Sequence, residues 1–256
     1  RTLNVSSIIA DNTGNAVKLV KTGGGRLQLN ANNSYSGGTI INEGNIEITN
    51  DSALGLSPSI TVDNFLTMNG GVLSGGSVPP GGSLSITFED KQGITLGTGG
   101  GGFAGDNGLT FRVESKVTGP GGIIMNPLFN IEGGSSGGVL ELVGANDFQG
   151  GLTVNIGEVV LGGYVGGVKA GTNTFKGAIT VNAGTLSIKN SAAVPASKPV
   201  VNLNGGRFQL FDDASIGALS SSGSGSVITS SSTLATGYVL KPTTLTINQD
   251  INTTYS

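Results

Sequence analysis

Few residues in this chain have types and a spacing that could support catalysis. Arg207 opens a predicted strand on its outward side, and Asp212 and Asp213 follow at the next turn. An arginine and two carboxylates that converge on one groove could bind and cleave an acidic polysaccharide. The interpretation we favour is a solvated turn beside a surface arginine. The charged run at positions 89–91 is likewise interpreted as a turn between two strands.

Other ligand-binding or catalytic chemistry has little support in the sequence. The chain contains no His and no Cys, which excludes Ser-His and Cys-His nucleophiles and removes the usual zinc ligands. The glycine-rich run from Gly97 to Gly108 lacks the following helix of a dinucleotide site and the Lys-Ser or Lys-Thr of a phosphate loop. Residues 101–106 form one imperfect copy of a calcium-binding nonapeptide, which needs tandem copies. Asp106 is therefore the one calcium candidate, and a loop or corner is favoured there. We expect no cofactor and no catalytic residue.

The composition favours strands and turns and excludes several classes of protein. Of the 256 residues, 46 are Gly, 11% are charged and 36% are hydrophobic, and that apolar share is enough to build a core. The remainder is mostly Ser, Thr and Asn, which favour turns and strands over helices. A net charge of −3 with scattered basic residues argues against a nucleic-acid partner. No apolar run reaches the roughly 18 residues of a membrane span.

An internal repeat organises the chain. The segments Asn33–Ile48, Asn146–Leu161 and Asn173–Ile188 align without a gap. Their shared pattern is Asn, any residue, an aromatic, any residue, Gly, Gly or Ala, a short strand, Asn, any residue, Gly and a second short strand. The defining residues are Asn33, Tyr35, Gly37, Gly38, Asn42 and Gly44, then Asn146, Phe148, Gly150, Gly151, Asn155 and Gly157, then Asn173, Phe175, Gly177, Asn182 and Gly184.

Each position of the repeat has a physical interpretation. Apolar residues alternate with polar ones on both sides of the Asn-X-Gly, which places one side of each strand in a core. The Asn-X-Gly marks a sharp corner, where Asn and Gly both tolerate a positive φ angle. In stacked coils the Asn side chains could form a ladder of amides. The aromatic residue is interpreted as a core residue beside a tight bend, and a sugar-stacking platform is the alternative.

The Asn-X-Gly turn could instead close an antiparallel hairpin. Hairpin signals favour two-residue Asn-Gly or Asp-Gly loops, and here a residue always separates Asn from Gly. A single hairpin could not bury these faces, whereas stacked coils bury one another. Strands with the same alternation lie before, between and after the copies, at Leu27–Leu29, Leu66–Met68, Leu84–Ile86, Ile94–Leu96, Leu109–Phe111, Leu140–Leu142, Phe208–Leu210 and Leu245–Ile247.

The repeat predicts an all-β fold, a right-handed single-stranded parallel β-helix without significant α-helix. At about 20–25 residues a coil, the chain would hold about ten to twelve coils. Stacking at about 4.8 Å a coil would give a rod of about 50 Å. We expect residues 1–256 to form one continuous segment of a longer chain. A loop or soft boundary is expected near 220–233, where the sequence is rich in Ser.

The three copies closely resemble the autotransporter-associated β-strand repeat, also called the passenger-associated transport repeat. The likeness includes the end of the unit at Ser52–Gly55, with a more divergent end at Ser191–Val194, and the lead-in Leu19–Leu29. The tail Thr244–Tyr255 resembles the start of another unit. The resemblance implies a passenger β-helix of a secreted bacterial surface protein, often an adhesin or its stalk. It also implies a repeat associated with export rather than with chemistry.

We therefore expect a non-catalytic structural or adhesive scaffold, located outside the cell on a bacterial surface. Its expected partners are neighbouring coils or copies of the same protein, and a host surface or extracellular polysaccharide. No nucleic acid and no membrane span are expected in this segment. One alternative is a filament subunit joined end to end, since uncapped coils expose unpaired strand edges. A second is a polysaccharide-active β-helical enzyme that uses Arg207, Asp212 and Asp213.

Overall fold

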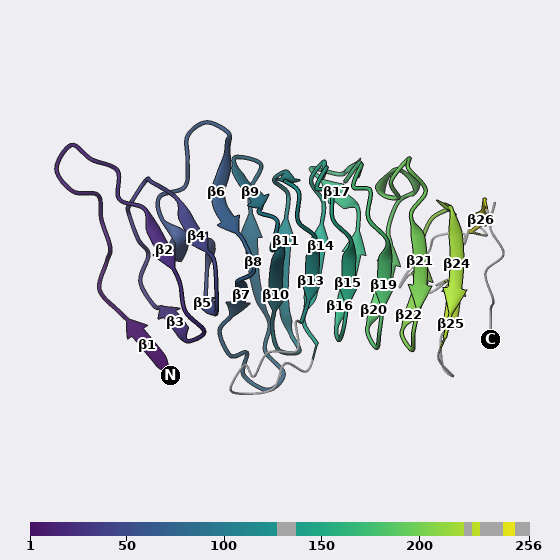
Figure 1. Ribbon diagram of the computed structural model, residues 1–256, viewed down its shortest axis with the longest axis horizontal. Helices are drawn as coiled ribbons and strands as arrows, with labels where there is room; N and C mark the ends of the chain where they lie inside the picture. The colour runs from purple at the N-terminus through teal and green to yellow at the C-terminus, as the bar shows by residue number, and fades with distance from the viewer. Residues whose placement is uncertain (127–136, 223–226, 231–242, 249–256) are drawn as a thin grey trace.

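The chain forms a parallel β-helix whose strands follow one another along a single long axis (Figure 1). The computed structural model describes residues 1–126, 137–222, 227–230 and 243–248. Within those ranges the only helices are two short 3-10 helices, η1 (Asp51–Leu54) and η2 (Ser191–Ala193). The predicted all-β solenoid is thereby confirmed. None of the helices in this part of the chain is long and apolar enough to cross a membrane.

Three long parallel sheets form the faces of the β-helix. Sheet I contains β1 (Thr2–Val5), β3 (Arg26–Leu29), β5 (Asn45–Ile48), β7 (Val72–Gly75), β10 (Gly101–Ala104), β13 (Ile123–Met125), β15 (Leu152–Val154), β19 (Ile179–Val181), β21 (Val200–Leu203) and β24 (Ala218–Ser221). Sheet II contains β8 (Leu84–Phe88), β11 (Leu109–Val113), β14 (Val139–Leu142), β16 (Glu158–Leu161), β20 (Thr185–Ile188), β22 (Arg207–Leu210) and β25 (Val227–Ser230). Sheet III contains β2 (Leu19–Lys21), β4 (Thr39–Ile41), β6 (Val62–Met68), β9 (Gln92–Leu96) and β12 (Val117–Thr118). Two smaller pairs are the antiparallel β17 (Gly163–Val165) with β18 (Val168–Ala170), and the parallel β23 (Ala214–Ile216) with β26 (Leu245–Ile247).

Each complete coil visits the faces in the order I, II, III, as in β7, β8 and β9 and again in β10, β11 and β12. Consecutive coils pair in parallel register, so that Leu27 lies beside Ile46, one coil further along. Burial alternates along β11, whose first, third and fifth residues are buried while the second and fourth are partly exposed. The inward columns meet in one apolar core, as the period-two pattern predicts.

The strands predicted outside the three repeat copies are all present, in β3, β6, β8, β9, β11, β14, β22 and β26. The coils differ more in length than a uniform 20–25 residues. Along the edge of sheet I, hydrogen-bonded residues of successive coils are separated by 29, 27, 22 and 18 positions. Corners of different length absorb these differences while the strands keep their register.

The glycine-rich run from Gly97 to Gly108 contributes to the core, and only its ends are turns. Its centre forms β10, which is buried between β7 and β13 in sheet I. A Cβ on Gly101 would lie within 3.0 Å of the Met68 side chain. The loop or corner that the sequence favours is therefore wrong for Gly101–Ala104, because glycine here admits close packing against a neighbouring coil.

The first copy of the repeat occupies different faces from the second and third copies. Asn33–Ile48 places its two strands, β4 and β5, in sheets III and I. Asn146–Leu161 and Asn173–Ile188 place theirs in sheets I and II and stack on each other in register. Between them lie coils with strands on all three faces, from β7 to β13. The repeat has thus moved by one face around the axis.

Candidate functional site

The Asn that opens each repeat copy is buried and joins neighbouring coils. Asn173 donates from Nδ2 to the carbonyl of Ala193 at 2.7 Å and accepts at Oδ1 from Nδ2 of Asn146 at 2.7 Å. Asn33 donates equivalently to the carbonyl of Ala53 at 2.6 Å and accepts a main-chain N–H of the preceding coil at 2.8 Å. These amides satisfy buried main-chain groups that the corners leave without a strand partner.

The aromatic residue of each copy is fully buried, as its interpretation as a core residue requires. The rings of Phe148 and Phe175 stack with centroids 4.8 Å apart and planes 8° apart. Tyr35 Oη bonds Thr39 Oγ1 at 2.6 Å, and Thr39 Oγ1 donates to the carbonyl of Leu54 at 2.9 Å. Burial raises the pKa of Tyr35 to about 12, against the lowering effect of the Thr39 hydrogen bond. The phenol is therefore a neutral core group.

The first glycine of each Gly pair lies where two coils meet backbone to backbone. A Cβ on Gly37, Gly150 or Gly177 would come within 3.0 Å of main-chain atoms of the preceding coil. The next position is also restricted in the first two copies, where Gly38 has a φ angle of 80° and a Cβ on Gly151 would lie 2.7 Å from the carbonyl oxygen of Ala178. Only the third copy has a side chain there, that of Ala178. The order of Gly followed by Gly or Ala therefore has a steric cause.

In the first two copies the glycine of the Asn-X-Gly corner adopts a positive φ angle, whereas Gly184 of the third copy does not. Gly44 and Gly157 have φ angles of 69° and 86°. Among the described residues, positive φ angles outside glycine occur only at Asn126 and Lys198. The expectation that the Asn of the corner also uses its tolerance of positive φ is therefore wrong.

The Asn residues of the later corners act through their side chains and form the amide ladder that the repeat suggested. Asn182 Nδ2 donates to Asn155 Oδ1, and Asn204 Nδ2 donates to Asn182 Oδ1, both at 2.8 Å. Ser222 Oγ extends the ladder by donating to Asn204 Oδ1 at 3.0 Å. Asn42 lies at another edge, because its copy places the preceding strand in sheet III.

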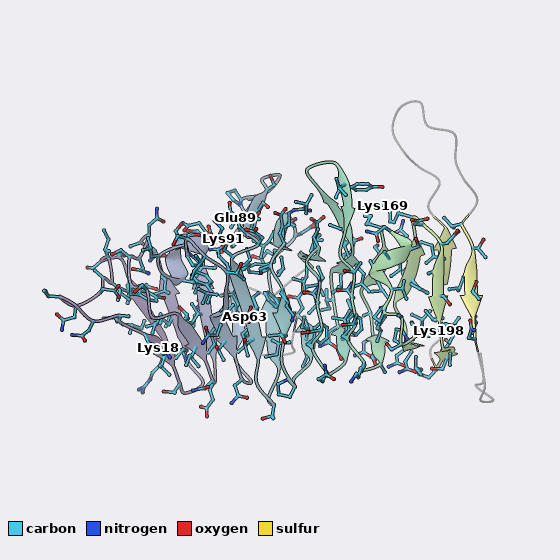
Figure 2. All side chains as sticks on the ribbon, turned by 90° about the horizontal axis from the view of Figure 1, so that it is seen from above. Lys18, Asp63, Glu89, Lys91, Lys169 and Lys198 are labelled. Carbon is cyan, nitrogen blue, oxygen red and sulfur yellow. The ribbon has the colours of Figure 1, made fainter. Side chains whose placement is uncertain are left out.

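A β-hairpin interrupts the repeat after its second copy. In the first and third copies the second strand is followed by η1 or η2, whereas in the second copy β17 and β18 take that place. The two-residue turn is Gly166-Gly167, with φ angles of 55° and 82°, as a tight type I′ turn requires. The hairpin, which carries Lys169, projects from the body of the rod (Figure 2).

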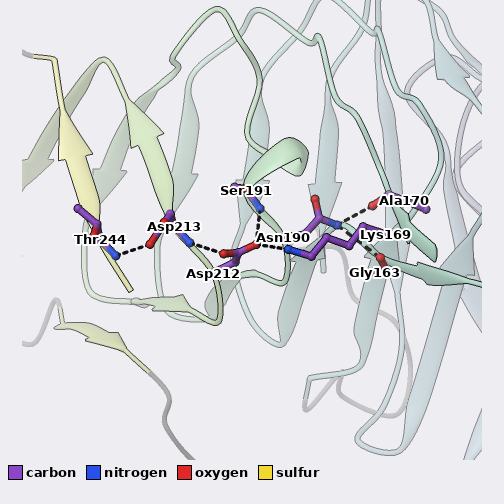
Figure 3. Close-up of polar contacts among 8 residues, drawn as sticks. All are labelled: Gly163, Lys169, Ala170, Asn190, Ser191, Asp212, Asp213 and Thr244. Carbon is purple, nitrogen blue, oxygen red and sulfur yellow. Dashed lines mark hydrogen bonds and ion pairs between the residues drawn. The ribbon is translucent and has the colours of Figure 1, made fainter. Parts of the chain in front are cut away.

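Residues of the next two coils hold the hairpin (Figure 3). Asn190 is buried and donates from Nδ2 to the carbonyl oxygens of Ala170 at 2.7 Å and Gly163 at 3.4 Å. These two residues are the ends of the hairpin and pair with each other. Lys169 Nζ forms an ion pair with Asp212 Oδ2 at 2.6 Å.

Arg112 holds the hairpin from the other side. Its Nη2 donates to the carbonyl oxygen of Tyr164 at 2.7 Å. Its Nε and Nη1 pair with Glu114 and Glu141, each at 2.7 Å. Burial by itself would lower the pKa of Arg112, but the hydrogen bonds and charges of Glu114 and Glu141 raise it above its ordinary value. The guanidinium is thus committed to structural partners.

The carboxylates of Asp212 and Asp213 continue this line of contacts along the rod (Figure 3). The N–H of Asp213 donates to Asp212 Oδ1 at 2.9 Å, and the N–H of Thr244 donates to Asp213 Oδ1 at 2.7 Å. Partial burial would raise the pKa of Asp212, but the hydrogen bonds from Lys169 and from the N–H groups of Asp213 and Ser191 lower it to about 2. Asp212 is therefore an anion at neutral pH and has a structural role.

Arg207 lies apart from the two carboxylates with which the sequence associates it. It is exposed at the start of β22, with Thr185 as its strand partner in sheet II. It lies at the opposite end of β22 from the bend that contains Asp212. Because Asp212 pairs with Lys169 instead, the structure does not assemble a cleavage site from Arg207, Asp212 and Asp213.

Asp106 lies in the turn between β10 and β11, where its carbonyl accepts the N–H of Leu109 at 3.0 Å. Across the described ranges, no group of three or more Asp, Glu, His or Cys side chains gathers as metal ligands would. The calcium candidate therefore gains no set of partner carboxylates from this part of the chain.

Charged side chains are spread along the rod, as the labelled residues from Lys18 to Lys198 show (Figure 2). The run that includes Glu89 and Lys91 forms the turn between β8 and β9, as the sequence predicts. Another pair, Lys116 Nζ with an Asp147 carboxylate oxygen at 2.7 Å, joins two coils next to sheet III.

Sequence reasoning missed the hairpin and one buried lysine. The turn Val165–Val168 is a Gly-Gly pair between two β-branched residues, a pattern typical of a tight hairpin that could have identified it. Lys21 occupies an inward position beside Ile41, and its ammonium donates to the carbonyls of Thr22 and Glu43 at 3.0 and 3.1 Å. Burial lowers the pKa of Lys21. Nothing in the repeat pattern predicts a lysine at that position.

Comparison with known proteins supports the family resemblance of the repeat. The model of the passenger-associated transport repeat matches residues 19–48, 135–161 and 170–188. These ranges contain the three copies and end at the same residues, so the resemblance is confirmed for those segments. In the structure they hold the buried Asn, the aromatic core residue and the glycine corner.

One similar protein is the adhesin BmaC autotransporter of Brucella suis biovar 1 (strain 1330). It is 29% identical to this chain over 164 residues, which make up 64% of this chain and 4% of that protein. The chain thus spans only a small part of the length of this relative. No solved structure matches the chain.

Proposed function

We propose that this chain is a non-catalytic β-helical segment of a surface-displayed passenger, in which it serves as a stiff scaffold that presents contact sites outside the cell. The observation that carries this proposal is the role of the repeat. Its buried residues join one coil to the next, as Asn146 does with Asn173 at 2.7 Å. None of the repeat side chains described above is arranged for chemistry.

The scaffold function follows from how the coils hold one another. Main-chain hydrogen bonds of parallel strands connect successive coils on three faces, and stacked Asn and Phe side chains add contacts at the corners. A solenoid of this kind gains stability from each interface between neighbouring repeats. The chain has no Cys, so this stiffness needs no disulfide.

The passenger repeat supports placement on the outer surface of a bacterium. The three matched segments and the similarity to an autotransporter adhesin both support export and display. The exposed hairpin, held on both sides by side chains of other coils, supports a role in contact with a partner.

Display can be tested in Gram-negative cells that produce the chain between a signal peptide and a translocator barrel. We expect antibodies against the chain to label intact cells as strongly as lysed cells. Labelling that requires lysis would contradict the proposal.

The absence of catalysis can be tested with the purified chain and a panel of polysaccharides. We expect no release of reducing or unsaturated ends. Release that is lost in the variants Asp212→Ala and Asp213→Ala would instead favour the enzymatic alternative.

A further inference from the structure

We propose that the hairpin β17–β18 is a contact site for a neutral polysaccharide, with the Tyr164 ring as the surface against which a sugar stacks. This inference deepens the proposed function and rests on it, because it names a ligand class for the exposed scaffold. Four observations support it: the exposure of the ring, the fixation of its backbone, the polar groups beside it, and the small size and paired cations of the surface around it.

Tyr164 differs from the other aromatic side chains that the structure describes. Tyr164 is 53% exposed to solvent. The other described rings are buried, apart from the half-buried Phe211, which has Lys189 Nζ above its ring at 3.6 Å from the centroid. A tyrosine combines a flat apolar ring with a hydroxyl that stays in water. Such a ring can cover the apolar face of a sugar while leaving the sugar hydroxyls solvated.

The backbone that carries Tyr164 is fixed before any ligand arrives. Arg112 binds its carbonyl oxygen at 2.7 Å, and Asn190 binds the carbonyls of Ala170 and Gly163 at 2.7 and 3.4 Å. All three contacts go to main-chain atoms, so the Tyr164 side chain remains available. A side chain presented on a rigid backbone loses little conformational entropy on binding, which favours affinity.

Polar groups lie on the same face of the hairpin as the ring. Tyr164 pairs directly with Lys169 across the two strands, and directly opposed residues of an antiparallel pair project to the same side. The Lys169 ammonium, whose side chain is 53% exposed, offers donors for sugar hydroxyls, and the largely buried Asp212 carboxylate at 2.6 Å holds it in place. Val165 and Val168 form the neighbouring pair and project to the opposite face.

Charge and size favour a neutral sugar polymer over an acidic one or a protein. Lys169 is balanced by Asp212, and Arg112 pairs with the two carboxylates of Glu114 and Glu141, so both cations that contact the hairpin in the described part of the chain are already paired with anions. A stable protein interface needs about 800 Å² from each partner, more than two three-residue strands present. A repetitive polymer can instead combine many weak contacts along rods displayed together.

Affinity electrophoresis of the purified chain tests this site. Native gels would contain a neutral polysaccharide (amylose, dextran, galactomannan or xyloglucan) or an acidic one (polygalacturonate or alginate). We expect at least one neutral polymer to retard the chain. Tyr164→Ala should raise the dissociation constant for that polymer, obtained from the retardation, about tenfold, since an aromatic contact is worth up to about a factor of ten in affinity. Tyr164→Phe keeps the ring, so its dissociation constant for the polymer should stay within about threefold of that of the original chain.

Val168→Ser is the matched control, because it changes the opposite face of the same hairpin. It should leave retardation unchanged, and circular dichroism should show the same β-sheet signal for all variants. The proposal is overturned if no neutral polymer retards the chain, if only acidic polymers do, or if Tyr164→Ala binds as well as the original. It is also overturned if Val168→Ser loses as much binding as Tyr164→Ala, which would indicate an apolar contact of the kind a protein makes.

Failure of this site can be told apart from failure of the proposed function. The gels use the purified chain, so their result does not depend on display. Cells that display a chain without affinity for neutral polymers would retain the scaffold function and lose the hairpin site. A chain that binds the polymer but never reaches the cell surface would retain the hairpin site and contradict the proposed display.

Discussion

The ring of Phe148 lies against the ring of Phe175 in the next coil, with centroids 4.8 Å apart and planes 8° apart. This distance is also the spacing of hydrogen-bonded strands, about 4.8 Å. Offset parallel rings at such a distance are one of the arrangements that aromatic pairs favour. The register of the coils and the preference of the rings therefore agree, which explains why an aromatic residue suits this position of the repeat.

Substitution of Phe175 should therefore destabilise the rod. Phe175→Ala removes a fully buried ring and its stacking partner, and we expect a loss of about 3–5 kcal/mol in the free energy of unfolding. Phe175→Leu should lose less, because it fills part of the space. Urea unfolding followed by circular dichroism measures both. Lys176→Ala, at the exposed neighbouring position, should change stability by less than about 0.5 kcal/mol, and an equal effect of both substitutions would refute the role of the ring.

Asn173 should be intolerant of substitution because both its polar atoms are used in a buried place. Asn173→Ala leaves the Ala193 carbonyl without its 2.7 Å donor, at a cost of about 1–3 kcal/mol for each buried group left unpaired. In Asn173→Asp the new carboxylate can still accept the hydrogen bond from Asn146, but while it is ionised it cannot donate one to the Ala193 carbonyl. Burial raises the pKa of such a carboxyl, so the destabilisation by Asp should be greatest at neutral pH and shrink on acidification.

Unfolding midpoints of the Asn173 variants at pH 7 and pH 4 provide the measurement. Thr172→Ala, at an exposed position beside it, serves as the control and should behave like the original chain at both pH values. An Asp variant that is equally stable at both pH values would show that the amide is not buried as described.

The first glycine of the Gly pair should reject even a methyl group. Gly177→Ala would place a Cβ within 3.0 Å of the backbone of Gly151, and we expect a loss of about 1–3 kcal/mol from overpacking. Gly24→Ala is the matched change, because a Cβ there meets nothing within 4 Å. Thermal unfolding should separate the two variants by several degrees. Equal melting temperatures would contradict the steric explanation of the pair.

The ion pair at the hairpin predicts local loosening in acid. The pKa of Asp212 is lowered from 3.8 to about 2 in the folded chain. The carboxylate therefore contributes stability that is present above the ordinary pKa and is lost as the pH falls through about 2. Hydrogen exchange of residues 163–170, corrected for the intrinsic effect of pH, should accelerate between about pH 4 and pH 2.

The variant Asp212→Asn isolates this effect from the titration of other carboxyls. It should exchange faster in the hairpin already at neutral pH and show no further acid response there. The same acid response in Asp212→Asn and in the original chain would assign the loosening to other groups.

The sequence by itself determined the kind of coil. Period-two alternation assigns the inward side of each strand locally, so every predicted strand is present, including weakly marked ones such as Leu84–Ile86 in β8. The burial of Tyr35, Phe148 and Phe175 follows equally from their type beside a glycine bend. Both the strand alternation and the burial of these aromatic residues depend on residues that are close in the chain, so they can be predicted from a single sequence.

Only the tertiary structure decided which coils and which charges meet. Successive coils differ by up to eleven residues in length, from 18 to 29, so distance along the chain does not reveal which positions stack. The first repeat copy is consequently offset by one face, and Asp212 meets Lys169, 43 positions away, instead of Arg207. The physical reason is that register depends on the combined packing of inward side chains from many coils, which no local pattern contains.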